Sequence, residues 1–475
     1  MLEVAQELLP FSRPFLLEIQ SEILSHLAVP DLKSCALVGR PWSNEANRLL
    51  WRFVRLELLI SDFSDLPSAS EKFGTFINTL ISHPEHAANI RRLALKIDGF
   101  VHDEETLSIL DSSTAFLRVP WNSIMRVLTS MSQLQCLRLG GRLLPYRLVS
   151  SICQALPEAP ISAISTFAPL INLPVMCTTW ATSIRDILLW VIGDCPELPP
   201  LPNLRFIASN NIEVVSKFVM SSPIESVYLF ETQSRSYSTL GDAIRARVCA
   251  GTSTLRSIYL SLSAYTGAIV PYVIRLLQCP TLEHIHIVLD CFFLDGSSPL
   301  ADYPSVCLAE GASFISQGLP TLKSLRFELY DEGLDRVPSK TVDRKQNPSH
   351  LESEAGLSLL TRLSQSNYPP LLEKIEIYSM GKSPSLETSD RYRTVSVEAS
   401  RIVSESGNGL GVSDVWAVKD SVEDIDLQYN ETVRAVGMIY PRWGFHNGCS
   451  IPAVPDADGI IRWSQSPSYI IEDLD

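Results

Sequence analysis

The chain has 475 residues, of which 45 % are hydrophobic and 19 % are charged, and its formal net charge at pH 7 is -14. This length exceeds what one hydrophobic core usually serves, so the sequence predicts two or more folded units or an array of repeats. The negative charge argues against nonspecific binding to nucleic acid or to an anionic membrane, because both require a cationic surface.

Ten cysteines are spread along the chain, and no two of them form a Cys-x-x-Cys pair. This pattern predicts buried, reduced thiols and a cytoplasmic or nuclear location. The N-terminal segment carries Glu3 and Glu7 and has no basic stretch before an apolar core, so we expect no signal peptide. No apolar run approaches the roughly 18 residues that a membrane helix needs, so we expect no membrane partner.

After an N-terminal extension over residues 1–14, residues 15–56 carry the densest apolar periodicity of the chain. Apolar side chains at spacings of three and four predict a helix over 16–27, a second over 32–38 and a third from Pro41 onward. Residues 53–56 then alternate apolar and basic side chains, which predicts a first strand.

Proline and aspartate define the expected boundaries of these helices. Val29-Pro30 is expected to end the first helix, since proline bars continuation and restricts the residue before it. Asp31 is expected to be the N-cap of the second helix, where its carboxylate would accept backbone N–H groups. Pro41 suits the first turn of the third helix.

Within this segment, L-x-E-I-x-x-E-I-L-S-H-L is followed by D-L-K-S-C-A-L-V-x-R-x-W and L-L-W-R. The pattern resembles an F-box and is most similar to the F-box-like proteins of fungi. In that family the apolar positions form a small helical fold and the contact with the adaptor subunit of SCF-type cullin–RING ubiquitin ligases. The resemblance implies that the adaptor-binding residues are Leu17, Ile19, Ile23, Leu24, Leu27, Leu32, Val38 and Trp42. The alternative is a helical cap that shields the first strand and binds no partner.

The remainder of the chain repeats the pattern apolar-x-x-apolar-x-apolar. Each copy predicts one strand, and the copies lie at 90–95, 134–139, 184–189, 201–206, 224–229, 255–260, 282–287, 322–327, 372–377 and 422–427. Some copies follow each other at the spacing of a leucine-rich repeat, such as the 27 residues from Ile258 to Ile285. The step of 50 residues from Leu325 to Ile375 predicts either a missed repeat or an inserted loop.

Between the predicted strands, apolar spacing typical of helices occurs at 71–82, 121–131, 265–278 and 354–366. We therefore expect an α/β fold in which residues 57–430 form a degenerate leucine-rich-repeat solenoid, with parallel strands inside and helices outside. This resembles the solenoid that often follows an F-box. A Rossmann-like domain is the alternative, although the sequence has no G-x-G-x-x-G.

Two charged or polar segments are expected to be loop insertions, at 331–352 and 381–411, and residues 431–475 are expected to form an irregular C-terminal cap with an acidic end. Residues between the apolar positions of each strand should share the outward face of the sheet. That face would either bind a target protein or be ordinary solvated surface, and its candidate residues are Arg138, Tyr228, Tyr259, His284, His286, Arg326, Glu376 and Asp426.

The sequence offers no catalytic motif. It lacks G-x-S-x-G, H-E-x-x-H and a Walker loop. His284 and His286 could reach one metal ion, but no third ligand is suitably spaced, so we expect neither a metal nor a cofactor. The expected function is that of a non-enzymatic substrate receptor that binds the SCF adaptor, and through it cullin, together with an unknown protein substrate. A stand-alone leucine-rich scaffold is the alternative, and an unrecognised hydrolase has no assembled site to support it.

Overall fold

The structure is a computed structural model of the whole chain. It describes residues 19–24, 27, 29–37, 40–60, 65–99, 119–141, 144, 146–167, 173–189, 197–232, 237–263, 279–290, 319–331, 371–382, 391–404 and 413–426. The chain divides into two compact units, the first holding the helices and strands up to Ile184 and the second those from Arg185 onward.

The first unit begins with three short helical segments. Residues 19–24 are helical, and they are followed by α2 (Val29–Ala36), α3 (Arg40–Leu50) and the strand β1 (Phe53–Ile60). The expected N-cap at Asp31 is wrong, because α2 already begins at Val29 and Asp31 lies in its first turn. Proline is tolerated at the start of a helix, where its missing N–H has no partner to lose, so Pro30 does not delay the helix.

These helical segments share a small apolar core. Leu24, Leu32 and Ala46 are buried at its centre, at 0 %, 4 % and 0 % exposure. Partly buried apolar side chains pack around them, namely Leu27, Cys35, Ala36, Trp42, Leu49 and Leu50. Each segment thus contributes one buried residue to a shared core, which stabilises three helices that would be too short to be stable alone.

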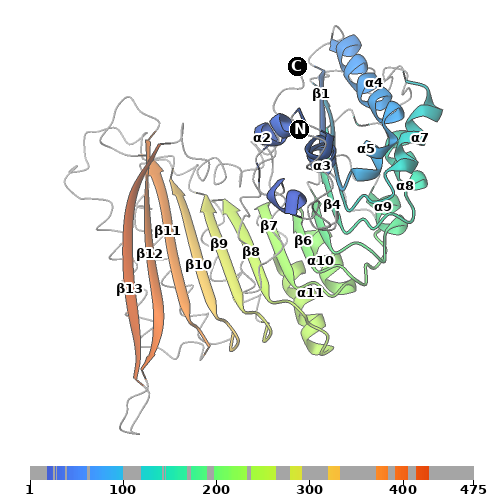
Figure 1. Cartoon of the computed structure of the whole chain (residues 1–475). Helices are drawn as coiled ribbons and strands as arrows, with labels where there is room; N and C mark the ends of the chain where they lie inside the picture. Colours follow the sequence, from blue (N-terminus) through green and yellow to red (C-terminus); the bar gives the residue numbers. More distant parts are fainter. Residues whose placement is uncertain are drawn as a thin grey trace, which may run out of the picture. The chain divides into compact units, whose positions relative to one another are not determined.

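The rest of the first unit alternates strands and helices. Parallel strands β1, β2 (Arg92–Gly99), β3 (Cys136–Gly140) and β4 (Ala163–Phe167) lie side by side in chain order. On one side of them lie the helices α4 (Leu66–Ser82), α5 (Pro84–Asn89), α7 (Trp121–Ser130), α8 (Tyr146–Ala155) and α9 (Leu173–Thr179) (Figure 1).

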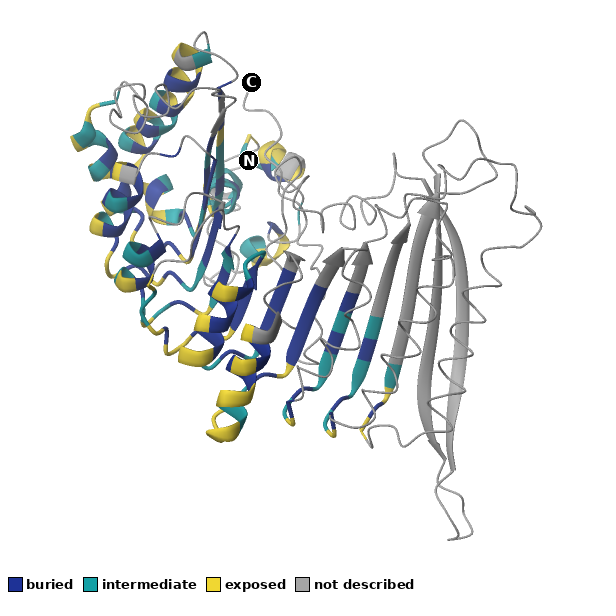
Figure 2. Cartoon of the chain, turned by 180° about the vertical axis from the view of Figure 1, so that it is seen from behind, coloured by how far each residue is buried: buried dark blue, intermediate teal, exposed yellow. Residues whose placement is uncertain are grey.

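The second unit continues this scheme. Its parallel strands follow chain order: β5 (Asp186–Leu189), β6 (Phe206–Ser209), β7 (Ser226–Thr232), β8 (Ser257–Ser263), β9 (His284–Asp290), β10 (Ser324–Asp331) and β11 (Lys374–Lys382). Helix α10 (Ile212–Ser221) follows β6, and α11 (Tyr237–Cys249) follows β7. One row of apolar residues crosses the strands in register and is fully buried, namely Ile187, Ile207, Val227, Ile258, Ile285 and Leu325. Figure 2 shows the buried stretches of the strands in dark blue.

The strand order decides between the two expected architectures. A doubly wound Rossmann sheet reverses its strand order at a switch point, whereas both units place successive strands next to each other. The Rossmann-like alternative is therefore wrong for the described strands. The α/β arrangement with a parallel sheet and helices is confirmed, and described helices lie between successive strands from β1 to β5 and from β6 to β8. The assignment as a leucine-rich-repeat solenoid stays a prediction.

The C-terminal strands differ from expectation. β12 (Arg391–Ser404) pairs antiparallel with β11, and β13 (Ser413–Asp426) pairs antiparallel with β12. The expected loop at 381–411 thus contains a strand, and the expected last repeat at 422–427 overlaps the end of an antiparallel one. A parallel crossover needs a dozen or more residues, so the short connections 383–390 and 405–412 suit only antiparallel pairing.

Some expectations fall on residues that the structure does not describe. They are the N-terminal extension at 1–14, the expected helices at 265–278 and 354–366, most of the insertion at 331–352, and the C-terminal segment at 431–475. Among the described helices, none combines the length and the apolar character required to cross a membrane.

Candidate protein-interaction site

Large apolar side chains are exposed on the N-terminal helices. In the described part of the chain, five large hydrophobic residues are exposed, and three of them lie in or directly after these helices: Ile19 at 41 %, Ile23 at 48 % and Leu37 at 89 %. We call these three residues the exposed apolar set. Exposed apolar side chains within so short a segment make it the candidate for a protein-interaction surface.

The helical geometry of residues 19–24 explains this exposure. Ile19 and Ile23 are four residues apart and therefore lie on the same side of the helix. Leu24 is rotated by about 100° from Ile23, and it points into the core, where it is 0 % exposed. The segment is consequently apolar on two sides, and only one of them is used within the fold.

A polar bridge fixes this segment against α3. Arg48 donates from Nε to Glu45 Oε2 at 2.7 Å and from Nη2 to Ser21 Oγ at 3.3 Å. The hydrogen bond from Arg48 holds the pKa of Glu45 below its ordinary value, although partial burial of the carboxyl opposes this shift. The charged pair keeps Ser21 next to α3, so the side of the helix with Ile19 and Ile23 faces away from the core.

The structure divides the eight residues expected to bind the adaptor. Ile19 and Ile23 are exposed and could contact a partner directly. Leu24 and Leu32 are buried and can contribute only to the stability of the helical fold. Leu27 and Trp42 are partly buried and pack on the core. The other two, Leu17 and Val38, lie outside the described residues.

Leu37 was missed by the sequence analysis although it is the most exposed member of the set. The resemblance assigned adaptor contacts in the second helix to Leu32 and Val38 and not to Leu37, which lies between them in the sequence. The sequence did contain a signal for Leu37: a leucine outside the apolar side of a short amphipathic helix does not pack on the core and is therefore expected to be exposed.

The second candidate surface is a row of polar and aromatic residues across β7–β11. Tyr228, Tyr259, His286, Arg326 and Glu376 are aligned in register on consecutive strands. The Tyr228 and Tyr259 rings stack with centroids 3.8 Å apart, and the His286 ring meets Tyr259 edge-on at 4.4 Å. We call these five residues the sheet row.

The two tyrosines of the sheet row are buried and not exposed. Tyr228 is 3 % exposed and Tyr259 is 1 % exposed, and each stacked ring covers one face of the other. His284, His286 and Arg326 are partly buried, and His284 Nδ1 lies 2.8 Å from Ser324 Oγ. Among the members of the sheet row whose burial is described, His286 and Arg326 are therefore the ones that keep some exposure.

The remaining expected target-binding residues lie elsewhere. Arg138 is a partly buried residue of β3 in the first unit, in register with Ala94 and Ser165. Asp426 is the last residue of β13, paired in register with Arg391. The structure thus does not bring all eight residues into one row.

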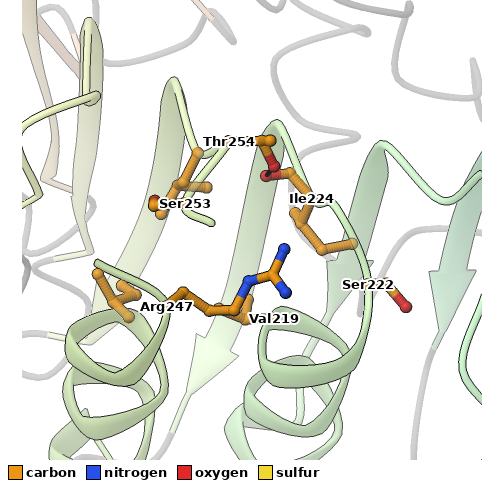
Figure 3. A pocket seen from close by; sticks show the side chains of 8 residues that line it. Val219, Ser222, Ile224, Arg247, Ser253 and Thr254 are labelled. Atoms are coloured by element: carbon orange, nitrogen blue, oxygen red, sulfur yellow. Dashed lines mark hydrogen bonds between the residues drawn. The ribbon is translucent and has the colours of Figure 1, made fainter. Parts of the chain in front are cut away.

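A small pocket lies between the ends of α10 and α11 (Figure 3), where Arg247 lies across from Ile224. The space inside it that a water-sized molecule can occupy is about 10 Å³, which is room for about one water molecule and not for a cofactor. Hydroxyl groups on its wall are already engaged, since Thr254 Oγ1 donates to Ile224 O at 2.8 Å and Ser253 Oγ lies 3.3 Å from Cys279 Sγ. The pocket is therefore no candidate for a catalytic site.

Two of the buried cysteines are unreactive at neutral pH. Burial raises the pKa of Cys177 to about 12 and that of Cys153 to about 11. Both side chains thus remain protonated thiols at neutral pH, and a thiol in this state is a poor nucleophile.

The chain matches no family model, and it matches no curated protein.

Proposed function

We propose that the chain is the substrate-receptor subunit of an SCF-type ubiquitin ligase. Its N-terminal helices bind the adaptor, and its β-sheet binds the protein that is to receive ubiquitin. The catalytic groups belong to other subunits, and the receptor accelerates transfer by holding the target near them. This function implies a location in the cytoplasm or nucleus.

The observation that carries the proposal is the exposed apolar set. The F-box-like sequence pattern predicts adaptor contacts at Ile19 and Ile23, and these two side chains are exposed while their neighbour Leu24 is buried. Covering a large aliphatic side chain removes apolar surface from water and is worth about 1.5–3 kcal/mol when burial is complete. Three such residues supply a realistic share of the binding free energy of a protein complex.

The target protein binds at the part of the sheet row that lies on β9 and β10. His286 and Arg326 combine a ring and a guanidinium with partial exposure. Arginine is enriched among the residues that dominate the binding energy of protein interfaces.

A scaffold function is the second candidate, because the N-terminal helices also cover the start of the sheet. The N–H of Arg52, just after α3, donates to Leu49 O at 3.1 Å, and the chain enters β1 at Phe53. Trp51 at this junction stacks on His86 of α5. In the scaffold alternative, this capping is the whole role of the helices.

Adaptor binding distinguishes the two functions. The double variant Ile19→Asp/Ile23→Asp places two charges in the proposed contact without touching the core, and we expect it to weaken binding of purified adaptor about 100-fold or more, since each 1.4 kcal/mol is a factor of ten. Met220→Asp is the matched control, because Met220 is 57 % exposed on α10.

Binding is measured by surface plasmon resonance with the full chain, and far-UV circular dichroism checks that each variant is folded. Wild type and Met220→Asp should bind alike. If the double variant binds the adaptor as tightly as wild type, or if wild type does not bind at all, the scaffold function is favoured.

A further inference from the structure

Two histidines and a glutamate converge at the junction of α4 and α5. The metal-ligating atoms of His83, Glu85 and His86 all lie within 4.8 Å of one another. His83 Nδ1 is 3.3 Å from Glu85 Oε1, and the two imidazole centroids are 5.1 Å apart. His83 and Glu85 are exposed, and His86 is partly buried, so the cluster opens to solvent.

The backbone holds these residues in place. His83 is the single residue between α4 and α5, and its N–H donates to Thr79 O at 2.9 Å. The N–H of His86 donates to His83 O at 2.9 Å. Pro84 further restricts the backbone of His83. The three donor groups are therefore carried by a turn whose conformation is already fixed.

Trp51 fixes the most buried of the three side chains. Its indole stacks on the imidazole of His86 with centroids 4.6 Å apart and planes 9° apart. Trp51 is itself held by a hydrogen bond from its N–H to Asn47 O at 2.9 Å. Stacking covers a face of the imidazole and leaves its nitrogens, which lie in the ring plane, able to coordinate.

We propose that His83, Glu85 and His86 bind a divalent transition-metal ion, with Zn²⁺ as the best fit. Imidazole nitrogen and carboxylate oxygen are ordinary Zn²⁺ ligands, at about 2.0–2.2 Å from the ion. Two ligands of one ion therefore lie up to roughly 4 Å apart, and rotation of the exposed His83 and Glu85 side chains closes the remaining distance. Solvent completes the coordination.

The bound ion would stabilise the first unit locally. It joins the end of α4 to α5, and through the Trp51 stack it also supports the junction between α3 and β1. This inference does not depend on the proposed ligase function, because it rests on residues outside both candidate surfaces.

Zn²⁺ binding to the metal-free full chain tests the site. Isothermal titration calorimetry of the chelator-treated protein should give one equivalent that is lost in His83→Ala/His86→Ala. The matched control is His284→Ala/His286→Ala, which removes the other close histidine pair and should keep that equivalent. Glu85→Gln preserves the size of an exposed side chain while removing its charge, so it should fold normally and bind Zn²⁺ more weakly.

Tryptophan fluorescence gives an independent readout. Cu²⁺ held at His86 should quench the adjacent Trp51, and Trp51→Phe should remove that quenching while the protein still binds the ion. The proposal is overturned if wild type binds no Zn²⁺, if the His83→Ala/His86→Ala protein binds as wild type does, or if the equivalent disappears in the His284→Ala/His286→Ala control.

Discussion

Trp180 is buried to 1 % exposure just after α9, and its indole Nε1–H donates to Leu156 O at 2.8 Å. Trp180→Phe removes the donor, leaves that carbonyl without this bond and opens a small cavity, so we expect a loss of roughly 1–3 kcal/mol in the free energy of unfolding. Urea denaturation followed by circular dichroism measures it.

The control for this change is Trp121→Phe. Trp121 is partly exposed at the start of α7, where the guanidinium of Arg147 lies 4.5 Å from its ring centroid. Such contacts are worth about 0.5–1 kcal/mol at exposed sites, so the control should cost less. Equal losses in the two variants would contradict the stabilising role expected for buried Trp180 and its hydrogen bond.

Asp186, the first residue of β5, gives the second prediction at the residue scale. Burial raises the pKa of its carboxyl to about 6, and the neighbouring Arg185 opposes this shift only in part. The folded-state pKa lies above the ordinary value of 3.8, so the stability that Asp186 contributes is complete below pH 3.8 and is lost as the pH rises through about 6.

Asp186→Asn should abolish this loss. Relative to the variant, the wild type should lose roughly 1–3 kcal/mol of unfolding free energy between pH 4 and about pH 7. Urea titrations at several pH values measure the difference, and a difference that stays constant with pH would contradict the assignment.

At the scale of elements, helix α10 shows how a single cap residue acts. Asn211 Oδ1 accepts hydrogen bonds from the N–H groups of Glu213 at 2.9 Å and Val214 at 3.1 Å. Asn211→Ala should cost about 0.5–2 kcal/mol of unfolding free energy, because these two donors lose their partner. Asn211→Asp, which keeps the acceptor, should cost little, and an equal loss in both variants would exclude capping as the cause.

The sequence predicts a strand wherever a copy of the pattern apolar-x-x-apolar-x-apolar is complete. It located β2, β3 and β5–β11 because their alternate positions must be apolar to fill the core. It missed β4, since Thr166 takes the place of the third apolar residue there, and Thr166 is nevertheless buried. The pattern did not predict β12, because an antiparallel strand joined by a short connection does not have to belong to a repeat unit. The sequence Arg391–Ser404 is instead rich in β-branched residues.

At the scale of the whole molecule, sequence periodicity predicted which side chains share a face and not what covers that face. It aligned Tyr228, Tyr259 and His286 correctly, yet the two tyrosines are buried against each other. The same limit applies to the N-terminal helices. The apolar pattern included both Ile23 and Leu24, and only the packing of the three segments shows that Leu24 is used internally while Ile23 remains exposed.

The central claim is that the N-terminal helices bind an SCF adaptor, and hydrogen exchange of the full chain tests it most directly. With saturating purified adaptor, we predict slower amide exchange within residues 19–37, because a bound partner suppresses local opening of these helices. Exchange in β6–β8 should be unchanged. Unaltered exchange throughout residues 19–37 would contradict the claim.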